Sequence, residues 1–127
     1  MDPFKTHGAF SWSELTTPNP KAASEFYGGL FGWSIKAQDM GTGPYHVVSV
    51  GDAQVAGMMA TPPDAPPMPP HWGVYITVNN TDETVAKCQK LGGKVLMPPM
   101  DVPTVGRMAV LQDPQGAVIN AIAYSGG

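Results

Sequence analysis

Glu14 is the residue in this sequence best placed to take part in acid–base chemistry, and it lies two positions after Trp12. Side chains two positions apart on a β-strand project from the same face. An inward carboxylate is costly unless it is paired, so we expect Glu14 to anchor a ligand or to exchange a proton with it. The alternative is a structural Glu14 that caps backbone N–H groups or pairs with Arg107.

The histidines offer a second kind of chemistry. His7, His46 and His71, together with Glu14, are the candidate donors for a metal, because two histidines and a carboxylate suit non-haem iron. His7 and His71 fall at the entrances of expected strands, and the sequence does not fix the face of His46. Hydrogen-bonding roles for these histidines are therefore favoured over metal ligation.

An internal repeat organises these residues. Asn19-Pro20 and Asn80-Thr81 each begin a helix-like stretch, 61 residues apart. Fixed spacings of this kind indicate a repeated unit. The matched pairs of interest are Trp12 with Gly73, Glu14 with Tyr75, Thr16 with Thr77 and, at an offset of 63, Gly57 with Asn120. The repeat predicts two βαβββ modules, residues 8–60 and 71–125, joined by a proline-rich linker at 61–70.

The pattern within each module predicts its elements. Apolar residues at helical spacing predict one stripe along the first helix, at Ala23, Phe26, Tyr27 and Leu30, and another along the second, at Val85, Cys88 and Leu91. Thr81 is expected to cap the second helix, and Cys88 to be a small buried core residue. The expected strands are 9–17, 33–36, 45–50, 54–59, 73–78, 94–97, 107–112 and 117–124, with turns at 41–43, 51–52 and 113–116.

Strand alternation assigns the faces. Val74, Ile76 and Val78 form an apolar face that should cover the helix, which leaves Tyr75 and Thr77 on the opposite face. The repeat carries this assignment to Trp12, Glu14 and Thr16. On the last strand, the residues expected to share one face are Val118, Asn120, Ile122 and Tyr124.

Composition narrows the function classes. The 127 residues carry a net charge of -3, and the seven basic residues are scattered, so neither nucleic acid nor a membrane surface is expected as a partner. No apolar run has membrane length, and no signal peptide is recognisable. The one cysteine, Cys88, excludes an internal disulfide. A single cytoplasmic domain spanning residues 1–127 is expected.

The sequence resembles the glyoxalase/bleomycin-resistance/extradiol-dioxygenase superfamily, also called vicinal oxygen chelate proteins. The resemblance covers nearly the whole chain and rests on four phrases: Thr16-Thr17-Pro18-Asn19-Pro20, Phe26-Tyr27-Gly28-Gly29-Leu30-Phe31-Gly32-Trp33, Leu91-Gly92-Gly93 and Asp113-Pro114-Gln115-Gly116. It implies an α+β fold in which the two βαβββ modules form a curved eight-stranded sheet around a cleft, with the helices outside. Relatives with this duplicated unit are frequently dimers, so a homodimer is expected.

In metal-dependent members of this superfamily, the ligands occupy the middle of the first and last strand of each module. The matching positions here are Trp12, Gly57, Gly73 and Asn120. Tryptophan and glycine side chains offer no ligand, and an asparagine carbonyl is a weak one for zinc, iron or nickel. We therefore expect no metal and no cofactor, and neither glyoxalase I activity nor extradiol ring cleavage.

The remaining expected cleft is aromatic and Met-lined. Stacking and apolar surface would come from Trp12, Met59, Tyr75 and Tyr124. The polar groups that orient a ligand would come from Glu14, Thr77 and Asn120. These residues predict a protein that binds a small, partly aromatic molecule, as antibiotic-sequestering relatives do. The alternatives are a metal-independent lyase, isomerase or hydroxylase-associated enzyme that uses Glu14 as general acid or base, and a non-catalytic partner subunit whose cleft is filled by Trp12.

Overall fold

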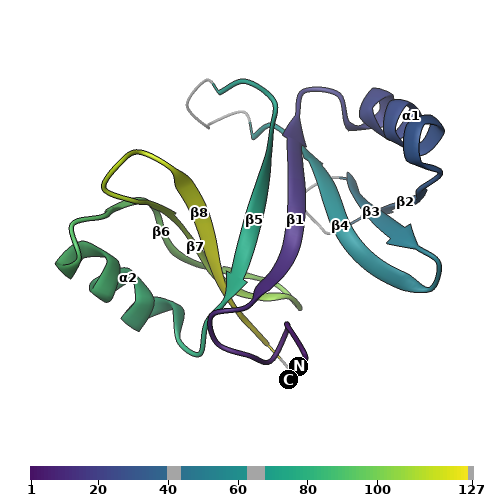
Figure 1. Ribbon diagram of the computed structural model, residues 1–127. Helices are drawn as coiled ribbons and strands as arrows, with labels where there is room; N and C mark the ends of the chain where they lie inside the picture. The colour runs from purple at the N-terminus through teal and green to yellow at the C-terminus, as the bar shows by residue number, and fades with distance from the viewer. Residues whose placement is uncertain (40–43, 63–67, 126–127) are drawn as a thin grey trace. The chain divides into compact units, whose positions relative to one another are not determined.

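The fold is α+β, as predicted, with eight strands and two helices among the described residues of this computed structural model, 1–39, 44–62 and 68–125 (Figure 1). Contacts divide the chain into two compact units. The first unit is residues 12–73, and the second unit is residues 1–11 with 74–127. In chain order the elements are β1 (Phe10–Thr17), α1 (Pro20–Phe31), β2 (Ser34–Asp39), β3 (Pro44–Val50), β4 (Ala53–Ala60), β5 (His71–Thr77), α2 (Thr81–Lys90), β6 (Lys94–Val102), β7 (Gly106–Gln112) and β8 (Val118–Tyr124).

The two halves repeat one strand order, which confirms the predicted repeat. The orders are β2-β3-β4-β1 and β6-β7-β8-β5, with β1 parallel to β4, β5 parallel to β8 and the other neighbours antiparallel. In the first half, Glu14 is paired with Gly57. In the second half, Tyr75 is paired with Asn120. The offsets of 61 and 63 residues therefore map one strand pairing onto the other.

Both helices begin where the sequence indicates. Asn19 Oδ1 accepts the Ala22 N–H at 3.0 Å, and Asn80 Oδ1 accepts the Glu83 N–H at 3.0 Å. Each asparagine thereby satisfies a donor that the first helical turn leaves unpaired. The expectation that Thr81 caps α2 is wrong by one residue, because Asn80 supplies the cap.

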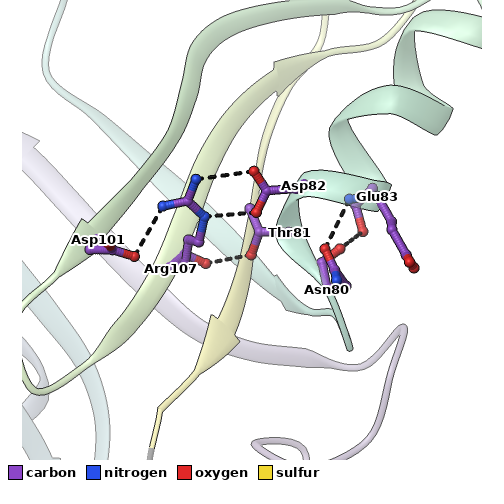
Figure 2. A network of polar contacts seen from close by, with 7 residues as sticks. Asn80, Thr81, Asp82, Glu83, Asp101 and Arg107 are labelled. Carbon is purple, nitrogen blue, oxygen red and sulfur yellow. Dashed lines mark hydrogen bonds and ion pairs between the residues drawn. The ribbon is translucent and has the colours of Figure 1, made fainter.

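The start of α2 is fixed to the sheet of its own unit by Thr81 and Arg107 (Figure 2). The buried Thr81 hydroxyl donates to the Arg107 carbonyl at 2.6 Å. The Arg107 guanidinium binds both oxygens of Asp82, at 2.7 and 3.0 Å, and Asp101 Oδ1 at 3.1 Å. Hydrogen bonding to Arg107 lowers the pKa of Asp82. Arg107 thus forms its ion pairs with these two aspartates of the second unit.

Each unit has its own apolar core on the helix side of its strands. The first core consists of Leu15, Val48, Ala56 and Met58, against which Ala23, Tyr27, Trp33 and Ile35 pack. The second core consists of Val78, Ala109, Leu111 and Ala121, with Val85, Cys88, Val95, Ile119 and Ala123 packed against it. Since neighbouring positions on a strand face opposite ways, the predicted non-helix faces of β1, β5 and β8 agree with these cores.

The helical stripes were predicted too wide. Ala23 and Tyr27 do contact the first core, but Phe26 and Leu30 are 61% and 56% exposed. Phe26 and Leu30 are not among the side chains that pack against the first core, so the buried stripe of α1 is narrower than predicted. Leu91 is 71% exposed, since α2 ends at Lys90 and Leu91 no longer follows the helical phase. Cys88 is half-buried rather than buried, with Sγ 3.8 Å from the Lys94 carbonyl.

Strand and turn predictions hold with one large exception. β6 runs to Val102 rather than Met97, through Pro98 and Pro99. Prolines are tolerated there because β6 is the last strand in its order and its pairing with β7 is irregular. The turn at Gly51 is confirmed by its positive φ of 59°. The predicted turn at 41–43 and residues 63–67 of the proline-rich linker lie outside the described residues.

The N-terminal segment, residues 1–11, belongs to the second unit, which the sequence did not indicate. Gly8 N–H donates to the Thr77 carbonyl at 2.8 Å, and Thr77 N–H donates to the Ala9 carbonyl at 2.9 Å. The Phe4 ring meets the Tyr124 ring edge-on at 5.2 Å. Residues from the start and the end of the chain therefore stabilise one another.

Candidate functional site

The first unit holds a hydrogen-bonded group of three side chains: Trp12, Glu14 and Tyr45. Trp12 Nε1 donates to Tyr45 Oη at 3.0 Å, and Tyr45 Oη donates to Glu14 Oε2 at 2.7 Å. All three side chains are partly buried. Trp12 and Glu14 therefore share one face of β1, as predicted, and Tyr45 of β3 connects them.

Gly57 explains how a residue of β3 reaches β1. β4 lies between these two strands, and Gly57 on β4 pairs with Glu14 on one side and with Val47 on the other. A methyl group added to Gly57 would overlap the Tyr45 ring. The missing side chain thus lets the phenol cross over β4 to the Glu14 carboxylate. A glycine inside a strand often marks such a close approach.

The direction of these hydrogen bonds is fixed by chemistry. The indole of Trp12 is a donor only, so Tyr45 Oη must be its acceptor. The phenol has one proton, and it is directed at Glu14 Oε2. A carboxylate accepts and does not donate when it is ionised. We call this one-way arrangement, from Trp12 through Tyr45 to Glu14, the relay.

The second unit carries different chemistry at the matched positions. Tyr75 corresponds to Glu14 and Met108 to Tyr45 at the same two offsets, and Tyr75 Oη donates to Met108 Sδ at 3.9 Å. Asn120, which corresponds to Gly57, donates its Nδ2 proton to the Val74 carbonyl at 3.2 Å. The contact between the first and third strand recurs in both units, but only the first unit has the relay.

Three other predicted site residues make their contacts within a single unit, Thr77 and Tyr124 in the second and Met59 in the first. Thr77 is buried and donates its hydroxyl to the Pro3 carbonyl at 2.6 Å. Tyr124 Oη is 2.7 Å from Ser11 Oγ. Met59 is half-buried and pairs with Thr16 on β1 and Tyr45 on β3. Tyr45 itself was missed from the sequence, although Gly57 in mid-strand was the signal that a neighbouring side chain comes close.

The residues present do not fit a transition-metal site of the superfamily. Trp12 directs its one polar atom, an N–H, at Tyr45, and position 57 has no side chain and is covered by the Tyr45 ring. The Asn120 side chain is engaged with the Val74 carbonyl. Across residues 1–39, 44–62 and 68–125, no group of three His, Cys, Asp or Glu side chains is arranged to hold a metal ion.

The histidines have separate environments. His7 Nδ1 accepts the Asn79 N–H at 2.9 Å, and His71 Nδ1 is 2.9 Å from the Pro69 carbonyl. His46 pairs with Met58 of the first core, so alternation puts it on the helix side of β3, opposite Tyr45. Its Nδ1 is buried without a hydrogen-bond partner in the described part of the chain. His46 and Glu14 therefore lie on opposite faces of their unit.

Two βαβββ units with matching strand registers define a class of protein, and solved structures share this fold. A hypothetical protein, BH1468 from Bacillus halodurans C-125, has a TM-score of 0.71 at 12% identity, covering 96% of this chain and 98% of that one. Methylmalonyl-CoA epimerase from Mycobacterium tuberculosis has a TM-score of 0.67 at 13% identity, covering 93% and 88%. At such low identity these similarities establish the fold alone.

The sequence profile of the Glyoxalase/Bleomycin resistance protein/Dioxygenase superfamily matches residues 9–121. The chain belongs to this superfamily. Among its relatives is "Putative glyoxylase CFP32" of Mycobacterium tuberculosis, which is 41% identical over 116 residues, or 91% of this chain and 44% of the relative. The anthracycline biosynthesis protein DnrV of Streptomyces peucetius is 37% identical over 123 residues, or 87% and 45%.

The chain thus spans less than half the length of these relatives. A membrane-spanning segment is not among the described helices, since neither is long and apolar enough.

Proposed function

We propose that this chain binds a small, partly aromatic molecule at a metal-free site, with Trp12 and Glu14 as principal contacts. The relay supports the proposal, because it holds an aromatic ring and a carboxylate on one strand face in fixed relative positions. Small-molecule sites combine apolar surface with a few oriented polar groups. Met59 of the same unit is a further candidate contact. The ligand contacts predicted at Tyr75, Thr77, Asn120 and Tyr124 belong to the second unit and stay predictions of that unit.

The relatives support an aromatic ligand. One is named for anthracycline biosynthesis, and anthracyclines contain fused aromatic rings with hydroxyl groups. Such rings stack on tryptophan and tyrosine, and their hydroxyl groups donate to a carboxylate. We therefore propose hydroxylated polycyclic aromatic molecules as the first ligand class to test. The homodimer expected from the resemblance stays a prediction, testable by light scattering.

Replacement of Trp12 tests the binding function directly. Loss of its ring removes stacking and apolar burial of about 1.5–3 kcal/mol, so Trp12→Ala should weaken binding by roughly 10- to 150-fold. The assay is calorimetric titration with hydroxylated naphthalenes and anthracyclines. Trp72→Phe is the matched control, because Trp72 lies outside the proposed site. It is 40% exposed, and its indole N–H donates a hydrogen bond to Tyr27 of α1. If Trp12→Ala binds every ligand as well as the parent protein, the proposed site is wrong.

A second candidate function is metal-independent catalysis with Glu14 as general acid or base. The observation that favours it is the 2.7 Å hydrogen bond between the Tyr45 phenol and the Glu14 carboxylate, which holds a proton-exchanging group in place. Glu14→Gln keeps the shape of the side chain and removes its titratable proton. Unchanged turnover of a ligand by this variant between about pH 5 and 9 would exclude an acid–base role.

A further inference from the structure

Tyr45 holds the other two members of the relay at once. Its oxygen receives the only polar hydrogen of the Trp12 indole, and its own hydrogen goes to Glu14. Both donor groups of the relay are thus directed inward along the chain of hydrogen bonds. The last member is a carboxylate, which has about four acceptor positions and, when ionised, no proton to offer.

Building on the proposed function, we propose that Tyr45 sets the ligand selectivity of the first unit. By holding Trp12 and Glu14 in the relay, it makes this face favour aromatic ligands that carry a hydroxyl or amino group over aromatic anions. Tyr45 is in this proposal a positioning residue, because it acts through the groups that meet the ligand.

Charge and hydrogen-bond polarity both support this selectivity. An anionic ligand beside an ionised Glu14 would place two negative charges together, and like charges brought together at a binding site weaken binding. The Trp12 N–H, a donor that could offset this repulsion, is directed at Tyr45. A ligand hydroxyl or amino group instead brings the hydrogen that a carboxylate accepts.

The matched positions of the second unit do not form a relay. Met108 stands where the first unit has Tyr45, and a thioether sulfur accepts weakly and donates nothing. Tyr75 stands in place of Glu14, so the corresponding pair holds no carboxylate. Discrimination against anions is therefore assigned to the first unit alone.

The experiment compares two probes that share one ring system, 2-naphthol and 2-naphthoate, by calorimetric titration near neutral pH. The parent protein should bind 2-naphthol at least about tenfold more tightly. Tyr45→Phe keeps the ring but removes the hydrogen bonds from Trp12 to Tyr45 and from Tyr45 to Glu14. It should weaken 2-naphthol binding, strengthen 2-naphthoate binding and reduce the preference by about five- to tenfold. Glu14→Gln should abolish the preference.

Tyr27→Phe is the matched control. It removes another phenol that accepts a tryptophan indole proton in the same unit, that of Trp72 at 3.2 Å. This control should leave the preference between the two probes unchanged. A ligand-independent readout is the ¹H–¹⁵N resonance of each indole, in which Tyr45→Phe should move the Trp12 signal and leave that of Trp72 in place.

The outcomes separate the two proposals. If neither naphthalene probe binds the parent protein, the proposed binding function fails for this ligand class and the selectivity proposal fails with it. If both probes bind equally well, or if Tyr45→Phe keeps the full preference, binding survives and the role of Tyr45 is wrong. An unmoved Trp12 indole signal in Tyr45→Phe would overturn the relay itself.

Discussion

Gly57→Ala tests the close approach on which the relay depends. The added methyl would overlap the Tyr45 ring, so the phenol has to move. A displaced phenol loses its hydrogen bond to the Glu14 carboxylate, about 1.5–3 kcal/mol, and that to the Trp12 indole, about 0.5–1.5 kcal/mol. We expect Gly57→Ala to lower the free energy of unfolding by about 2–4 kcal/mol, measured by urea denaturation.

The same substitution in a Tyr45→Ala protein tests whether the Tyr45 ring is the obstacle. Gly57 is absent from the described glycines with positive φ, so its backbone accepts alanine without strain. In a Tyr45→Ala protein the obstacle is gone, and Gly57→Ala should be neutral or stabilise by up to about 1 kcal/mol. The coupling between the two sites should therefore be at least about 2 kcal/mol.

The control glycine is Gly29 on α1, which has nothing within 4 Å of the position a Cβ would take. Gly29→Ala should stabilise the protein by about 0.5–1 kcal/mol, as expected for a helix interior. The reasoning is refuted if Gly57→Ala has the same effect on stability in the parent and in the Tyr45→Ala protein, because the ring would then not be the obstacle.

Three further predictions concern the second unit and the metal. Thr81→Val should lower the free energy of unfolding, measured by urea denaturation, by about 1–3 kcal/mol. The reason is that the Arg107 carbonyl loses the hydrogen bond from the buried Thr81 hydroxyl. The stabilising effect of Asp82, whose pKa is lowered by Arg107, should be fully present above its ordinary pKa of 3.8 and disappear as the pH falls through the lower folded value. Asp82→Asn should therefore be less stable than the parent near neutrality and equal to it in acid, and a difference that persists in acid would contradict this. Glu83→Gln, a change in the same turn outside the ion pair, is its control. Elemental analysis after dialysis should find no stoichiometric transition metal. About one bound metal per chain would contradict the expectation that the residues at the matched ligand positions cannot hold a metal.

The sequence was sufficient to predict the fold because its signals are local and repeated. Asn19 and Asn80 mark the helix starts in both modules, and the two offsets map the Glu14–Gly57 strand pairing onto the Tyr75–Asn120 pairing. The failures concern packing. Leu30 satisfies the helical period, yet whether a stripe is buried depends on the width of the sheet beneath it.

The candidate site was predictable in part for the same reason. Alternation alone puts Trp12 and Glu14 on one face, because it depends on two nearby positions. Tyr45 could not be assigned, since its contact with Glu14 crosses an intervening strand and depends on an absent side chain at Gly57. The ligand-binding roles of the predicted residues stay predictions until a ligand is found.

The attachment of the N-terminal segment to the second unit has a consequence for synthesis. Tyr124 follows Ser11 by 113 residues, so Phe4 and Ser11 are made well before their partner. These contacts can therefore close only after Tyr124 has left the ribosome, and closing so long a loop slows folding. Until then, the N-terminal segment has its partners in β5 but lacks those in β8. A nascent chain therefore leaves Phe4 and the start of β1 without their contacts to Tyr124 until β8 has been made.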